Sequence, residues 1–116
     1  MAERFTMKTN DLEPSFEVQL LDGSTPVDLT SAMGVLFIMR NRKGVKAIGA
    51  MNVADQTASD TVGIVTYTWV LGDTDTVGTY QVEVEVTWPG LRQQTFPAAQ
   101  YLIVSVQKSL SPVGAS

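Results

Sequence analysis

Residues 79–88 alternate between apolar and polar side chains at almost every position. The apolar members share one parity: Tyr80, Val82, Val84, Val86 and Trp88. The polar members share the other: Gln81, Glu83, Glu85 and Thr87. A period of two is typical of a β-strand with one buried and one wet face, whereas a helix would scatter these apolar residues around its axis. The segment therefore predicts a half-buried strand.

Further segments show the same period or a short apolar run, with turn residues between them. The expected strands are residues 4–8, 16–20, 27–30, 34–42, 45–53, 63–70, 92–96 and 100–107. Residues 41–44 are expected to join two strands as a tight hairpin, and Asp22-Gly23 marks another turn. The run Val35 to Met39 is apolar throughout, which predicts a central strand covered on both sides or one whose outer side carries a partner.

These strands predict an all-β fold, an antiparallel β-sandwich of about seven to nine strands. No segment of ten or more residues has a helical period, and short strands separated by turns are typical of a sandwich or small barrel. The 15 Val and 13 Thr, against nine Leu and nine Ala, agree with this fold class. We expect one domain over residues 1–108 and a flexible tail over residues 109–116, which are small and polar.

A local pattern ahead of the best strand indicates an immunoglobulin-like sandwich. Gly78 lies two residues before Tyr80, at the strand start. This is the pattern of a tyrosine corner, in which the ring packs in the sandwich and the hydroxyl bonds backbone a few residues upstream. The second cysteine of an antibody domain would fall at Val82, so the contact between sheets would be apolar here. The alternative is an ordinary buried tyrosine that opens a strand.

Composition argues against most enzymes. The chain has no cysteine and no histidine, which removes disulfides, thiolate and histidine metal sites, and the usual catalytic triads. Its net charge of −4 lacks the basic excess of nucleic-acid-binding proteins. The longest apolar run has five residues, against about 20 for a membrane span. We expect no catalytic activity, cofactor, metal, small-molecule substrate, nucleic acid or membrane contact.

Three groups of charged residues have competing interpretations. Glu83 and Glu85 share the polar face of one strand at a spacing that acid catalysis could use, but a solvated face or interface rim is the favoured interpretation. The loop aspartates could bind calcium, but turn capping is favoured for all four, Asp55, Asp60, Asp73 and Asp75. The basic cluster around the hairpin tip is interpreted as a solubilising hairpin or as a patch that meets an acidic neighbour: Arg40, Arg42, Lys43 and Lys46.

Apolar residues on normally wet parities are candidates for contact with another protein. They are Leu21, Leu36, Ile38 and Ile103, and for each the alternative is burial within a strand covered on both sides. Together with the basic cluster and the two glutamates they form the predicted interface. Trp69 and Trp88 are assigned to the core, with Gly78 and Tyr80 as further structural residues. Under an alternative hypothesis, a carbohydrate- or host-surface-binding module, one tryptophan would stack on a sugar.

With the strands laid out, the chain resembles the immunoglobulin-like N-terminal domain of bacteriophage baseplate upper proteins. The segments that carry the resemblance are residues 10–11, 16–20, 22–23, 27–32, 35–40, 63–69, 73–74, 78–80, 83–87, 94–97 and 101–104. It implies a virion adaptor that docks on the tail or baseplate core and carries receptor-binding parts on a C-terminal extension, with no catalytic residues. This chain ends about eight residues after its last expected strand, so we expect a small stand-alone virion protein.

The resulting hypothesis is a bacteriophage structural protein of the tail, baseplate, neck or capsid surface. Its expected partners are other virion proteins and further copies of itself. The first 20 residues carry six charges and no apolar signal region, so we expect synthesis in the host cytoplasm and a final location in the virion.

Overall fold

The computed structural model describes residues 3–96 and 102–109, and every regular element within them is a strand. The eleven strands are β1 (Glu3–Lys8), β2 (Phe16–Gln19), β3 (Leu21–Asp22), β4 (Thr25–Pro26), β5 (Gly34–Asn41), β6 (Gly44–Ala50), β7 (Asn52–Val53), β8 (Ile64–Tyr67), β9 (Gly78–Trp88), β10 (Arg92–Phe96) and β11 (Leu102–Gln107). Eight of these have four or more residues, and β3, β4 and β7 have two each. The all-β prediction is confirmed for the described residues.

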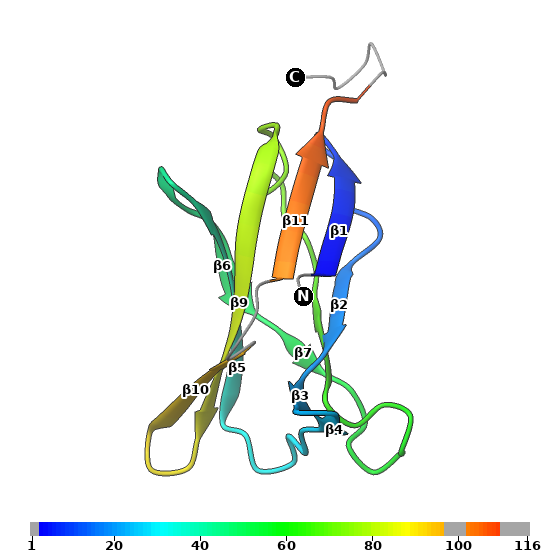
Figure 1. The fold of residues 1–116 in the computed structure, drawn as a ribbon, viewed down its shortest axis with the longest axis vertical. Coiled ribbons are helices and arrows are strands. Elements are labelled where there is room, and N and C mark those ends of the chain that lie inside the picture. Colours follow the sequence, from blue (N-terminus) through cyan, green and yellow to red (C-terminus); the bar gives the residue numbers. More distant parts are fainter. Residues whose placement is uncertain (1–2, 97–101, 110–116) are drawn as a thin grey trace.

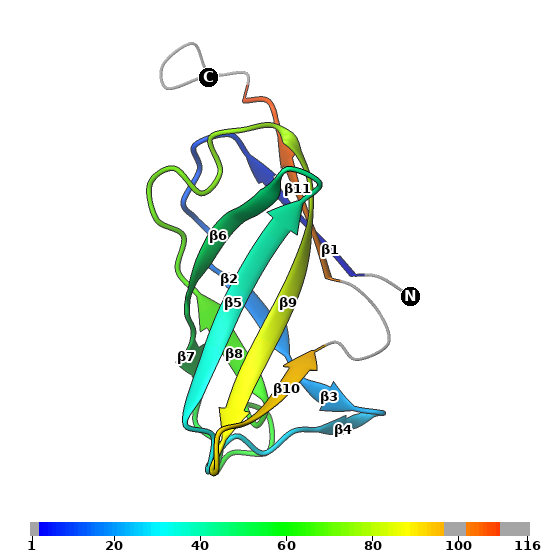
Figure 2. The same ribbon diagram turned by 90° about the vertical axis from the view of Figure 1, so that its left-hand side faces the viewer.

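Two sheets face each other across the core, which gives the fold a β-sandwich-like character (Figures 1 and 2). The larger sheet has the order β1-β11-β9-β5-β6, with β10 also paired to β9, and the smaller has the order β2-β8-β7. The β3–β4 hairpin stands apart from both. The described strand pairs are antiparallel, as expected, except β1 with β11, which is parallel. These strands lie at opposite ends of the sequence, so no short hairpin ties them into an antiparallel arrangement.

The alternating segment behaves as its period predicts. In β9 the inward side chains Tyr80, Val82, Val84 and Val86 are almost fully buried, and Trp88 at the strand end is partly buried against the core. The polar residues between them point to the other face and keep some exposure. Because β9 lies between β5 on one side and β10 and β11 on the other, its valines lie at the centre of the inward side of the larger sheet.

Aromatic rings connect the two sheets. The rings of Phe37 in β5 and Tyr67 in β8 stack with centroids 4.0 Å apart and planes 8° apart. Trp69 packs edge-on against both, at 5.6 Å from Phe37 and 5.4 Å from Tyr67. Such pairs are worth about 0.5–1.5 kcal/mol each beyond the area they bury. Trp69 is therefore a core residue, as predicted.

The tyrosine corner is present at the start of β9. The hydroxyl of Tyr80 donates a hydrogen bond of 2.8 Å to the carbonyl of Thr76, four residues upstream. Gly78 lies against the ring: a Cβ at this position would be 3.4 Å from ring atoms of Tyr80. Tyr80 thus holds the loop before β9 against the sandwich, which is more than an ordinary buried tyrosine would do.

The expected strand over residues 45–53 is wrong as one element. Its first part is β6, which pairs with β5, and its last two residues are β7, which pairs with β8 in the other sheet. Met51 between them is buried, and its N–H donates to the carbonyl of Val35 at 2.9 Å. Burying Met51 at the sheet edge lets the chain cross from one sheet to the other.

The short strand expected over residues 27–30 is also wrong. The carboxylate of Asp28 accepts hydrogen bonds from the N–H and the hydroxyl of Thr30, at 2.9 and 2.6 Å. A side chain that bonds its own backbone two residues on competes with a strand ladder. The resulting turn directs Leu29 into the core, where its N–H donates to the side-chain oxygen of Gln56 at 3.0 Å.

The last strand ends close to the start of the predicted tail. The N–H of Ser109 donates to the hydroxyl of Thr9 at 3.1 Å, and the other residues of that tail, 110–116, lie outside the described residues. Residues 100 and 101 of the predicted strand 100–107 also lie outside them. Within the described ranges, no helix is long and apolar enough to cross a membrane.

Candidate interaction face

Most of the predicted interface residues lie on one surface, the outward side of β5, β6, β9 and β11, which we call the outer face. Across β5 and β9, Leu36 stands opposite Glu85 and Ile38 opposite Glu83. One step further along the strands, Arg40 stands opposite Gln81. Figure 2 looks onto this surface, with the smaller sheet behind it. In that view the end of the β5–β6 hairpin overlaps β11, and among the described residues no strand or loop is drawn in front of β5.

An apolar strip runs along the β5–β6 half of the outer face. Cross-strand pairing places Ile38 beside Ile48 and Leu36 beside Ala50. Val45, opposite Arg40, extends the strip toward the hairpin. Leu36 and Ile38 are half-buried, whereas the side chains of Val45 and Ile48 are 57% and 56% exposed. The apolar strip is thus a contiguous group on open sheet, unlike the single exposed apolar residues found on most proteins.

A β-bulge brings the exposed members of the strip together. Val45 and Ile48 are three positions apart, so strict alternation would place them on opposite faces of β6. The register shifts between Met39 and Arg40: Met39 pairs with Ala47, and Arg40 pairs with Val45. Lys46 is left as the extra residue, so Val45 and Ile48 share the outer face.

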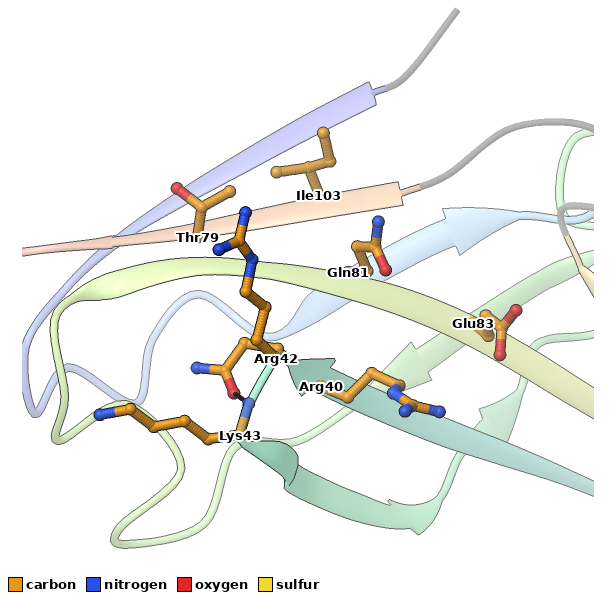
Figure 3. A pocket seen from close by; sticks show the side chains of 8 residues that line it. Arg40, Arg42, Lys43, Thr79, Gln81, Glu83 and Ile103 are labelled. Carbon is orange, nitrogen blue, oxygen red and sulfur yellow. Dashed lines mark hydrogen bonds between the residues drawn. The ribbon is translucent and has the colours of Figure 1, made fainter.

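The hairpin end of the outer face contains an open hollow of about 780 Å³. Its walls come from the β5–β6 hairpin, from β9 and from β11, and its lining residues are Arg40, Asn41, Arg42, Lys43, Thr79, Gln81, Glu83 and Ile103 (Figure 3). The side chain of Asn41 accepts a hydrogen bond of 2.9 Å from the N–H of Lys43, which holds the tip in shape. The hollow is therefore a cationic recess at the edge of the apolar strip.

The charges of the outer face have few partners within the chain. Among residues 3–96 and 102–109 the one ion pair joins Lys46 to Asp75. Lys46 therefore binds the loop before β9 through Asp75. Hydrogen bonds from Lys46 and from Thr76 lower the pKa of the Asp75 carboxyl. In the same described part of the chain, Arg40, Arg42, Lys43 and Glu83 form no ion pair. Glu85 accepts a long hydrogen bond of 3.3 Å from the side-chain amide of Gln93.

Eight of the ten predicted interface residues thus share the outer face: Leu36, Ile38, Arg40, Arg42, Lys43, Glu83, Glu85 and Ile103. Lys46 is paired with Asp75, and Leu21 lies on β3, in the separate hairpin. Sequence reasoning missed Val45 and Ile48. Their signal was two apolar side chains beside a lysine in an edge strand, but their shared face depends on the bulge.

The residues considered for sugar or acid chemistry do not come together around the hollow. Trp69 is only 3% exposed, and Trp88 is partly buried, with its ring N–H donating to Gln94 at 3.1 Å. Glu83 lines the hollow, whereas Glu85 does not. The two carboxylates therefore stand side by side on a sheet surface without a shared cleft.

Two of the four loop aspartates, Asp73 and Asp55, accept hydrogen bonds within or next to their own loops. Asp73 is buried and accepts hydrogen bonds from the hydroxyl of Tyr67 at 2.7 Å and the N–H of Val70 at 3.0 Å. Asp55 accepts bonds from Thr57, and its pKa is lowered by them. These two loops lie toward opposite ends of the molecule (Figure 1). Within the described residues, no group of three or more acidic, histidine or cysteine side chains could hold a metal ion.

A scan against protein-family models, a search of curated proteins and a search of solved structures each find no match for this chain. The fold and the outer face therefore carry the functional inference.

Proposed function

We propose that this chain is a bacteriophage structural protein, an immunoglobulin-like module that assembles with other virion proteins in the tail, baseplate, neck or capsid surface. The observation that carries the proposal is the outer face, where an apolar strip and charges without described ionic partners share one sheet. An apolar centre with a polar rim is typical of protein–protein contact surfaces.

The strand order supports the immunoglobulin-like part of the proposal. In that fold the strands C, F and G form one sheet and B, E and D lie in the other, and variable-type domains add C′ beside C. Here β5, β9 and β11 take the places of C, F and G, with β6 beside β5 as C′, and β2, β8 and β7 take the places of B, E and D. The bond from Tyr80 to Thr76 matches the tyrosine corner of strand F.

The chemistry of the outer face supports contact with a protein rather than turnover of a substrate. Its hollow is open, and its lining contains neither histidine nor cysteine, which the chain lacks altogether. Arginine and isoleucine side chains on a rigid sheet can bury apolar area and pair charges with little loss of backbone freedom. These are the properties that an assembly module needs.

The test is whether the protein is part of a phage particle. Particles from a strain that encodes the chain are banded in a density gradient and probed with an antibody against it. We expect the protein to co-band with the major capsid protein at a constant ratio. A chain found only among the free proteins above the particle band would contradict the proposal.

A matched pair of variants makes the test specific for the outer face. Ile48→Lys places a charge in the apolar strip, and Glu17→Lys places one on β2, in the opposite sheet; both wild-type side chains are exposed, so both variants should fold. We expect Ile48→Lys to deplete the protein from the particle band while Glu17→Lys leaves the ratio unchanged.

A further inference from the structure

We propose that the outer face binds a second copy of this chain, in a face-to-face dimer whose two-fold axis lies in the interface plane, perpendicular to the strands, between the level of Ile38 and the level of Arg40. The inference rests on the proposed function of assembly through protein contacts, and it names the partner and the residues that would meet. Its basis is the distribution of charge and apolar area along β5 and β9.

The charges of the outer face are separated along the strand direction. The cations Arg40, Arg42 and Lys43 lie at the hairpin end, around the hollow. The carboxylates lie further from the hairpin tip: Glu83, which also lines the hollow, is level with Ile38, and Glu85 is level with Leu36. Each step of two residues along a strand is about 6.5–7 Å. The face therefore passes from cationic to acidic over two such steps.

A two-fold axis that lies in the plane between two such faces and runs perpendicular to the strands reverses the strand direction of one copy relative to the other. The cationic end of each copy then lies over the acidic end of its partner, which makes two equivalent sets of opposite-charge contacts. Stacking the copies in the same direction would instead superpose like charges, which is unfavourable. One face therefore supplies both the positive and the negative charges of the contact, so a second copy can serve as the partner.

The apolar strip has the position that this arrangement requires. The axis exchanges the level of Ile38 and Ile48 with the level of Arg40 and Val45, so Ile48 lies against the partner's Val45. The side chains of Ile48 and Val45 are 56% and 57% exposed, and both would be covered. The apolar residues then lie beside the charged ones at the centre of the contact. Excluding water there buries apolar area and strengthens the attraction between opposite charges.

The size of the face sets the expected strength. Four strands at about 4.8 Å spacing and seven residues at about 3.3 Å rise cover roughly 20 × 23 Å, or about 500 Å² in projection. Counted over both copies this is about 1,000 Å², which is below the range of stable interfaces and within that of weak, transient ones. We therefore expect a dimer with a dissociation constant in the micromolar range, which would be populated at the high local concentration inside a particle.

Charge reversal tests the pairing directly. One variant carries Arg40→Glu with Arg42→Glu, the other carries Glu83→Lys with Glu85→Lys, and each is studied by analytical ultracentrifugation across the micromolar range. Wild type should dimerise with concentration, each variant alone should lose about tenfold or more in dimer affinity, and an equimolar mixture should recover a heterodimer close to wild-type affinity. The matched control for the second variant, Glu17→Lys with Asp22→Lys, makes the same charge change as Glu83→Lys with Glu85→Lys on exposed residues outside the outer face and should dimerise as wild type does.

Three outcomes would overturn the proposal: a wild-type chain that stays monomeric at every concentration, a mixture of variants that fails to recover the dimer, or a control that weakens as much as the test variants. The thermal unfolding midpoint of each variant shows whether it is folded, and Ile48→Lys provides a second probe of the same face. Particle banding separates this inference from the proposed function. A monomeric chain that still co-bands with particles overturns only the dimer, whereas a dimer that never enters particles overturns only the virion assignment.

Discussion

The hydroxyl of Tyr67 donates a hydrogen bond of 2.7 Å to the carboxylate of Asp73, and both residues are buried. The same carboxylate oxygen accepts the N–H of Val70 at 3.0 Å. Because the Tyr67 ring also stacks on Phe37 of the other sheet, this bond ties the loop after β8 to the contact between the sheets. Replacing Tyr67 with Phe leaves the ring in place but removes the donor to Asp73. We expect the free energy of unfolding to fall by about 1–3 kcal/mol, measured by urea denaturation at neutral pH.

Alkaline pH should destabilise the folded chain through the same tyrosine. Burial, followed by the hydrogen bond to Asp73, raises the pKa of Tyr67. The folded state therefore keeps this proton where the unfolded state loses it, above the ordinary tyrosine pKa of about 10. Stability is unaffected by this group below that pH and decreases as the pH rises beyond it. Urea titrations between neutral pH and about pH 11 should show the decrease in wild type and a shallower one in Tyr67→Phe; equal slopes would contradict this assignment.

Gly49 lies against the same ring. A Cβ at this position would be 3.0 Å from Cε1 of Tyr67, and the ring cannot yield easily because Phe37 and Asp73 hold it. We expect Gly49→Ala to lower the free energy of unfolding by about 1–3 kcal/mol. Gly34→Ala is the matched control in β5, since a Cβ there meets no atom within 4 Å. If both substitutions have the same effect on the denaturation midpoint, packing against Tyr67 is not the cause.

Leu91 carries backbone strain at the β9–β10 hairpin. Its φ is +60°, a left-handed conformation that costs a leucine about 1–2 kcal/mol, and its side chain is 80% exposed. Asparagine tolerates this conformation better, so Leu91→Asn should raise the free energy of unfolding by about 1 kcal/mol. Leu71→Asn, at a comparably exposed leucine without a positive φ, should change it by less than about 0.5 kcal/mol. A destabilised Leu91→Asn would show that the leucine makes a contact that outweighs its strain.

The tyrosine corner should protect the loop before β9. Tyr80→Phe removes the 2.8 Å bond to the carbonyl of Thr76 and should cost about 1 kcal/mol of unfolding free energy. Amide hydrogen exchange should become faster around residues 75–78 and stay unchanged in β2, which lies in the other sheet. Uniform acceleration over the whole chain would instead indicate a general loss of stability.

Much of the fold could be predicted because the alternation of apolar and polar residues along a strand shows which of its side chains are buried. The alternation in residues 79–88 predicted the inward set of β9, and the period of two also placed Ile103 outward and Val104 inward. Gly78 and Tyr80 predicted the corner at the right residues. In each case the relevant contacts lie within a few positions, or on one face of one strand, so local patterning is sufficient.

The composition of the outer face was decided by contacts far apart in the sequence. The bulge opposite Met39 and Arg40 put Val45 and Ile48 on one side, and Lys46 was drawn to Asp75, 29 residues away. The crossing at Met51 and the parallel pairing of β1 with β11 also depend on which strands meet. The period of a sequence predicts which side chains share a buried face, but register, bulges and ion-pair partners follow from tertiary packing. The sequence by itself therefore determined an all-β chain with an amphipathic central strand, and only the tertiary structure assembled its charges and apolar strip into one face.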